Sequence, residues 1–63
     1  MYLVFYKTSD VFEVEELFNQ KGIINEVVPT PVQDKAYCGV CLKVDSNPIL
    51  FELIKNYEYT CVE

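Results

Sequence analysis

The stretch "AYCGVCLKV", residues 36–44, contains the side chains best suited to chemistry, Cys38 and Cys41. A thiol can act as a nucleophile, as a redox partner or as a metal ligand. The chain has three cysteines and no histidine, which excludes catalysis by a Cys–His or Ser–His couple. Three alternatives follow: a redox pair, part of a metal site, or one working cysteine beside an inert one.

A redox pair of the Cys-x-x-Cys type normally lies at a helix N-terminus, where both cysteines share a face and the thiolate is stabilised. Here Cys41 lies within an alternating pattern that is typical of a strand. Positions three apart in a strand point to opposite faces, so the two thiols can meet only if Cys38 and Gly39 belong to the preceding turn. A thiol–disulfide switch through this pair stays open.

A metal site of the usual kind needs four Cys or His ligands, often as two Cys-x-x-Cys pairs. This chain has one such pair, a distant Cys61 and no histidine. A site shared between two subunits would supply the missing ligands, but within one chain we expect neither a metal nor another cofactor.

The third alternative is a single working thiol, Cys38, where the chain enters a strand from a loop. Gly39 is expected to permit a backbone conformation closed to other residues and to let a second molecule approach closely. Free backbone N–H groups in the turn around the two prolines, with Lys35 nearby, would stabilise a thiolate or persulfide anion. The alternative is an inert, half-buried cysteine, which is common for this residue type.

The elements that position these residues follow from the hydrophobic pattern. Apolar and β-branched runs predict strands at residues 2–6, 23–28, 38–44 and 57–62, with a loop over residues 32–37. Asp10 and Glu13 have the spacing of a capping box, so a first helix should begin near Asp10 and end at Lys21 and Gly22. Asn47 as N-cap and Pro48 as first residue predict a second helix, with an apolar side made by Ile49, Leu50, Leu53 and Ile54.

The order β-α-β-β-α-β predicts one α+β domain over residues 1–63 with the ferredoxin-like arrangement, a four-stranded antiparallel sheet with two helices on one face. Its first and third strands should be central. If Leu3 and Phe5 face the helices, the open face should carry the remaining strand side chains, namely Tyr2, Val4, Tyr6, Cys41, Lys43, Tyr57, Tyr59 and Cys61. Such an aromatic surface predicts that a partner protein or a second copy of the chain covers it. The alternative is that the tyrosine rings only shield the small sheet while their hydroxyl groups reach water.

The composition of the chain excludes several classes of binding partner. Ten acidic and five basic residues give a net charge of −5, which opposes binding to nucleic acid. The apolar start of the chain is too short for a signal peptide or a membrane span, so no membrane partner is expected. An odd number of cysteines without a secretory signal indicates free thiols in the cytoplasm.

The segments "YLVFYKTSD", "VVPTP" and "YCGVCLKV" at these spacings resemble a family of small bacterial domains described as selenium/sulfur carrier-like. The resemblance covers nearly the whole chain. It implies that Cys38 bears the chalcogen, that Gly39 is its partner, and that the loop Pro29, Thr30 and Pro31 presents it. The chain departs from the family by Val32 in place of an arginine, by Ala36 and Tyr37 in place of small hydroxyl residues, and by Cys41 in place of a small residue. A resolving role for Cys41 stays open.

Two hypotheses result. In the first, the protein is not an enzyme but a carrier: a donor protein passes sulfur or selenium to Cys38, and an acceptor protein removes it. In the second, the protein is an interaction or small-ligand-binding module that uses the aromatic sheet face, and the cysteines are incidental.

Overall fold

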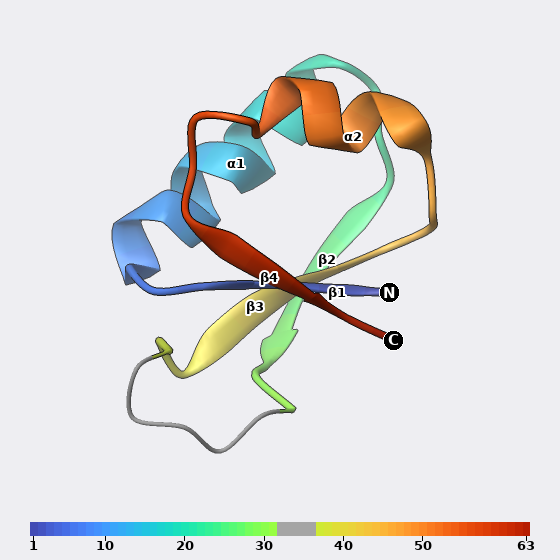
Figure 1. Ribbon diagram of the computed structural model, residues 1–63. Helices are drawn as coiled ribbons and strands as arrows, with labels where there is room; N and C mark the ends of the chain where they lie inside the picture. Colours follow the sequence, from blue (N-terminus) through green and yellow to red (C-terminus); the bar gives the residue numbers. More distant parts are fainter. Residues whose placement is uncertain (32–36) are drawn as a thin grey trace.

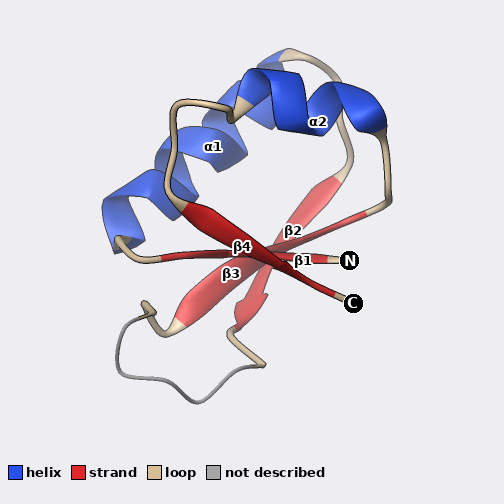
Figure 2. Ribbon diagram, in the orientation of Figure 1, coloured by secondary structure: helices blue, strands red, loops and turns tan. Residues whose placement is uncertain are grey.

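The computed structural model describes residues 1–31 and 37–63, which form an α+β fold with the predicted order of elements. The elements are β1 (Tyr2–Phe5), α1 (Thr8–Gln20), β2 (Asn25–Pro29), β3 (Val40–Val44), α2 (Pro48–Leu53) and β4 (Tyr59–Val62). Both helices cover the same face of one sheet (Figures 1 and 2). The ferredoxin-like arrangement is therefore confirmed.

The sheet has the order β2-β3-β1-β4, and every neighbouring pair is antiparallel. The predicted central position of the first and third strands is confirmed. In the register, Leu3 of β1 lies opposite Leu42 of β3 and Cys61 of β4. Residues directly opposite each other share a face, so this register decides which side chains face the helices.

The main hydrophobic core lies between the sheet and the two helices. Its buried members are Leu3, Phe5, Val11, Val14, Phe18, Leu42, Val44, Leu50 and Ile54. The three from α1 recur at helical spacing, as the sequence predicts. Each such side chain contributes roughly 1.5–3 kcal/mol when it is fully removed from water, so this cluster is the main source of stability.

Helix α1 begins at Thr8, two residues before the predicted start. Lys7 occupies the N-cap position without a side-chain hydrogen bond to the helix, so the capping box of Asp10 and Glu13 is wrong. Asp10 lies inside the first turn, where a carboxylate interacts favourably with the helix dipole. The predicted end is confirmed, since Lys21 is the C-cap and Gly22 has a φ of +72°.

Helix α2 is capped as predicted. The side chain of Asn47 accepts a 3.1 Å hydrogen bond from the Ile49 N–H, and Pro48 follows as the first helical residue. Leu50 and Ile54 are buried. Ile49 is 52% exposed, so its predicted place on the apolar side is wrong, because this short helix turns its first residues towards solvent.

All four strands are shorter or shifted relative to the pattern, and β1 ends at Phe5 rather than at Tyr6. β2 starts two residues late but continues through Pro29, which an edge strand tolerates because its outer side needs no N–H donor. β3 starts at Val40 rather than at Cys38, and β4 starts at Tyr59. Of the predicted loop at residues 32–37, positions 32–36 lie outside the described residues.

Candidate functional site

Thr30 and the Cys38–Gly39 peptide lie side by side where β2 ends and β3 begins. The Thr30 hydroxyl donates a 2.8 Å hydrogen bond to the carbonyl oxygen of Cys38. The Thr30 backbone N–H donates a 3.0 Å hydrogen bond to the carbonyl oxygen of Gly39. The structure therefore brings together the proline-flanked threonine and the Cys-Gly pair that the sequence singled out.

Cys38 is also attached to the central strand β1. Its backbone N–H donates a 3.1 Å hydrogen bond to the Phe5 carbonyl oxygen, and its half-buried side chain packs against the main core. The Cys38 thiol donates to the carbonyl oxygen of Val40 over 2.9 Å. In this conformation the sulfur atom is a hydrogen-bond donor held close to its own strand.

Two backbone amides near the Cys38 thiol already have hydrogen-bond acceptors. The N–H groups of Cys38 and Thr30 are both bonded to carbonyl oxygens, so neither is free to bind an anion, and residues 32–36 of this turn lie outside the described residues. Lys35, the expected positive charge, lies outside the described residues. Within the described part of the chain, the Gly39 N–H makes no hydrogen bond to a backbone carbonyl.

Gly39 is exposed and has no positive φ, so the expected glycine-only conformation is wrong. A Cβ atom built at this position would meet no atom within 4 Å. The chain itself therefore does not need a glycine here. The open space leaves room for a second molecule to approach the backbone beside Cys38.

Cys41 faces away from the helices, as predicted, but it is fully buried. Its thiol lies 3.8 Å from the Pro29 carbonyl oxygen. Burial raises the pKa of Cys41, the nearby Cys38 raises it further, and a hydrogen bond with Thr30 opposes both effects. Cys41 thus remains a protonated thiol at neutral pH, and both it and Cys38 are free rather than joined in a disulfide.

Cys61 does not lie on the open face. It pairs with Leu3, whose side chain is in the core, so the two share the face that the helices cover. Cys61 is exposed because β4 is an edge strand. Partial burial, and then the charge of Glu63, raise the pKa of this thiol.

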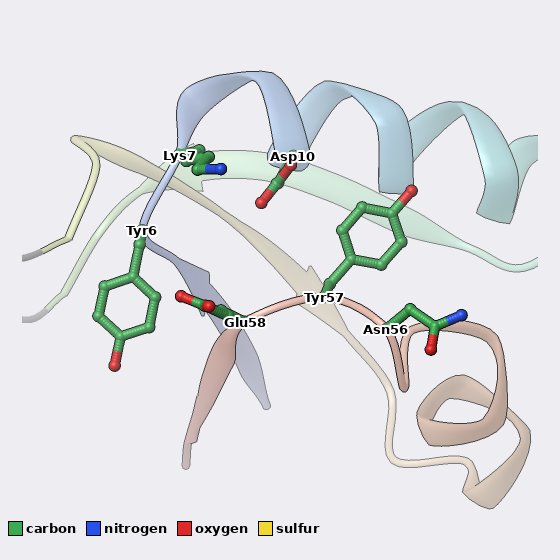
Figure 3. Close-up of a pocket in the computed structure, with 6 residues that line it drawn as sticks. All are labelled: Tyr6, Lys7, Asp10, Asn56, Tyr57 and Glu58. Atoms are coloured by element: carbon green, nitrogen blue, oxygen red, sulfur yellow. The ribbon is translucent and has the colours of Figure 1, made fainter.

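Two of the tyrosines expected on the open face also lie on the other side. Tyr59 pairs with Phe5 in the register, and the rings of Tyr57 and Tyr59 lie 6.4 and 6.1 Å from that of Phe5. Figure 3 shows Tyr57 on the same side as α1 and Tyr6 pointing away from it. The aromatic surface predicted for the open face is therefore much smaller than expected.

A polar pocket of about 220 Å³ lies between the start of α1 and the turn before β4 (Figure 3). It is lined by Tyr6, Lys7, Asp10, Asn56, Tyr57 and Glu58. No residue of the Cys38 site lines it. The sequence pattern did not indicate this pocket, because its lining comes from two segments that are far apart in the chain.

Among residues 1–31 and 37–63, no cluster of three or more Cys, Asp or Glu side chains is arranged to hold a metal ion. In the same ranges, no helix has the length and apolar character needed to cross a bilayer.

The fold and the site define a small ferredoxin-like domain in which a partly exposed cysteine is held by a proline-flanked threonine. A family model described as "Putative Se/S carrier protein-like" matches residues 1–60, and the chain belongs to this family. The resemblance stated from the three sequence segments is thereby confirmed. Comparisons with curated proteins and with solved structures gave no match.

Proposed function

We propose that this protein is a non-enzymatic carrier that holds sulfur or selenium on the side chain of Cys38. The family description suggests a carrier of these elements. The observation that carries the assignment to Cys38 is the pair of hydrogen bonds from Thr30 to the Cys38 and Gly39 carbonyl oxygens. These bonds fix the cysteine beside a glycine that leaves room for a partner.

The other two cysteines are less suited to the role. Cys41 is fully buried, and both Cys41 and Cys61 have a raised pKa, which favours the unreactive thiol over the nucleophilic thiolate. Cys38 is partly exposed and is joined to a central strand. It therefore combines access with a fixed position.

Loading begins with the Cys38 thiolate, after its proton is lost to solvent. The thiolate attacks the outer sulfur of a donor cysteine persulfide; a new S–S bond forms on Cys38, the S–S bond of the donor breaks, and the donor sulfur leaves as a thiolate. The same exchange with a donor S–Se group leaves selenium on Cys38. An acceptor nucleophile then removes the outer atom and regenerates the Cys38 thiolate.

This exchange requires the Cys38 sulfur to leave the Val40 carbonyl oxygen. A thiolate has no proton to donate to that oxygen, so ionisation itself removes the attraction that holds the sulfur against β3. The side chain then turns towards the space over Gly39.

The partners of such a carrier are a donor protein and an acceptor protein.

A homodimer through the open face of the sheet stays a prediction. The aromatic surface available for it is smaller than predicted, because Tyr57 and Tyr59 pack on the helix side. Sedimentation velocity over a range of concentrations tests it: a monomer at all concentrations rules the dimer out. No observation favours the interaction-module hypothesis over the carrier.

The test is incubation with a cysteine desulfurase and cysteine, followed by intact-protein mass spectrometry. We expect an adduct of one sulfur mass that reducing agent removes. Cys38→Ser should abolish the adduct, whereas Cys61→Ser, the matched control, should retain it. An adduct that persists in Cys38→Ser, or no adduct under conditions that load another carrier, would contradict the proposal.

A further inference from the structure

The residue before Cys38, Tyr37, reaches across the face of the sheet that the helices leave open. Its ring stacks on Tyr6 with 4.9 Å between ring centroids and 25° between planes. Its hydroxyl oxygen lies 3.3 Å from the hydroxyl oxygen of Thr60. Tyr6 directly follows β1 and Thr60 belongs to β4, so one side chain contacts residues from two separate segments of the chain.

The register places the Tyr37 hydroxyl contact on the open face of the sheet, next to Val4. Val4 is not part of the core under the helices, because it alternates with Leu3 and Phe5, yet it is 0% exposed. Thr60, which contacts the Tyr37 hydroxyl, is the cross-strand neighbour of Val4. The Tyr37 hydroxyl therefore lies at the cross-strand neighbour of the buried Val4, on the face of the sheet away from the helices.

Cys38 is consequently held on both sides. On its N-terminal side, Tyr37 is fixed to Tyr6 and Thr60 by a stacked ring and a hydroxyl contact. On its C-terminal side, Thr30 bonds the carbonyl oxygens of Cys38 and Gly39. The cysteine therefore has an attached residue or peptide group on each side of it.

We propose that Tyr37 is a positioning residue for the carrier thiol, acting through its contacts with Tyr6 and Thr60; this rests on the proposed function of Cys38. While Tyr37 is attached, the Cys38 backbone keeps one location just before the start of β3, and the thiol moves only by rotation of its side chain. When Tyr37 is detached, the Cys38 backbone separates from the sheet more often. Small reagents then reach the sulfur faster, while a donor protein, which needs the sulfur at a fixed place, loads it more slowly.

The test compares Tyr37→Phe, which keeps the ring, Tyr37→Ala, which removes both contacts, and Thr60→Val, which removes the hydroxyl partner. The rate of alkylation by iodoacetamide is measured separately at Cys38 and Cys61 by peptide mass spectrometry. We expect the Cys38 rate to rise about threefold in Tyr37→Phe and Thr60→Val, as one weak hydrogen bond is lost. In Tyr37→Ala it should rise on the order of tenfold, because the ring contact is lost as well.

Cys61 serves as the internal control, because its side chain lies on the opposite face of the sheet from the contact between Tyr37 and Thr60. Equal rates at Cys38 in all four proteins, or an equal rise at Cys38 and Cys61, would overturn the proposal. The second result would indicate general destabilisation instead of local positioning.

Sulfur loading gives the second measurement. We expect Tyr37→Ala to load Cys38 more slowly than the unmodified chain, and Tyr37→Phe to recover most of the rate. Unchanged loading in Tyr37→Ala would overturn a positioning role in the transfer. If the alkylation rates change as expected but the unmodified chain takes up no sulfur, the carrier function fails while the attachment of Cys38 by Tyr37 stands.

Discussion

The Thr30 hydroxyl donates to the carbonyl oxygen of Cys38 over 2.8 Å, across the connection between two neighbouring strands. Because the Thr30 N–H also bonds Gly39, one residue of the "PTP" segment fixes two consecutive carbonyl groups of the cysteine segment. The two sequence features that resemble the carrier family are thus one structural unit.

Thr30→Val keeps the shape of the side chain and removes the donor. We expect the free energy of unfolding to fall by about 1 kcal/mol, measured by urea denaturation, and sulfur loading to slow. The pKa of Cys41 should rise further, because the Thr30 hydrogen bond opposes its elevation. Thr30→Ser, which keeps the hydroxyl, should behave like the unmodified chain, and equal loading in Val and Ser variants would argue against this role.

Gly39→Ala tests the space beside the cysteine. Its Cβ would meet nothing, and φ is not positive, so the free energy of unfolding should change by less than about 0.5 kcal/mol or increase slightly. If a partner approaches the backbone here, loading by a donor protein should slow while alkylation by a small reagent does not. Unchanged loading would mean that partners do not approach this closely.

Cys41 makes the free energy of unfolding depend on pH in the alkaline range. Since burial raises its pKa above 9.0, the folded chain keeps this proton when the unfolded chain has lost it. The resulting stabilisation is fully present below about pH 9 and is lost as the pH rises through the folded value. In a Cys61→Ser background, Cys41→Ala should therefore lose less stability between neutral pH and pH 10 than the chain with Cys41, measured by urea denaturation. Identical slopes would contradict the prediction.

Asn47→Ala separates stability from function. It removes the side-chain cap of α2, so the free energy of unfolding should fall by about 1 kcal/mol. The cap lies outside the Cys38 site, and loading should remain normal. If loading slowed as much as in Thr30→Val, the effect of the latter would reflect stability alone.

Local signals in the sequence predicted the order of elements, the central strands and the cap of α2, because these depend on short-range pattern and on a common connection rule. The predicted sheet face of the Tyr59 and Cys61 side chains was wrong, because that face depends on the register of β4 against β1. A shift of one residue reverses every side chain of a strand, and periodicity alone does not fix that shift.

For the candidate site, the sequence indicated the residues but not the contacts between them. The resemblance singled out both Thr30 and Cys38, but their hydrogen bond joins residues on either side of a connection and could not be read from spacing. The contacts of Tyr37 with Tyr6 and Thr60 were also missed, because they combine three segments of the chain. In both cases the sequence pattern carries no information about contacts between segments that are distant in the chain.

The hydrogen bond from the Cys38 amide to Phe5 has a consequence for hydrogen exchange. Although Cys38 lies outside a regular strand, its amide is bonded to the carbonyl oxygen of a central strand. Such amides exchange with deuterium only when the surrounding structure opens. The exchange rate of this single amide would therefore report how often the cysteine segment detaches from the sheet, in the unmodified protein and without any chemical reagent.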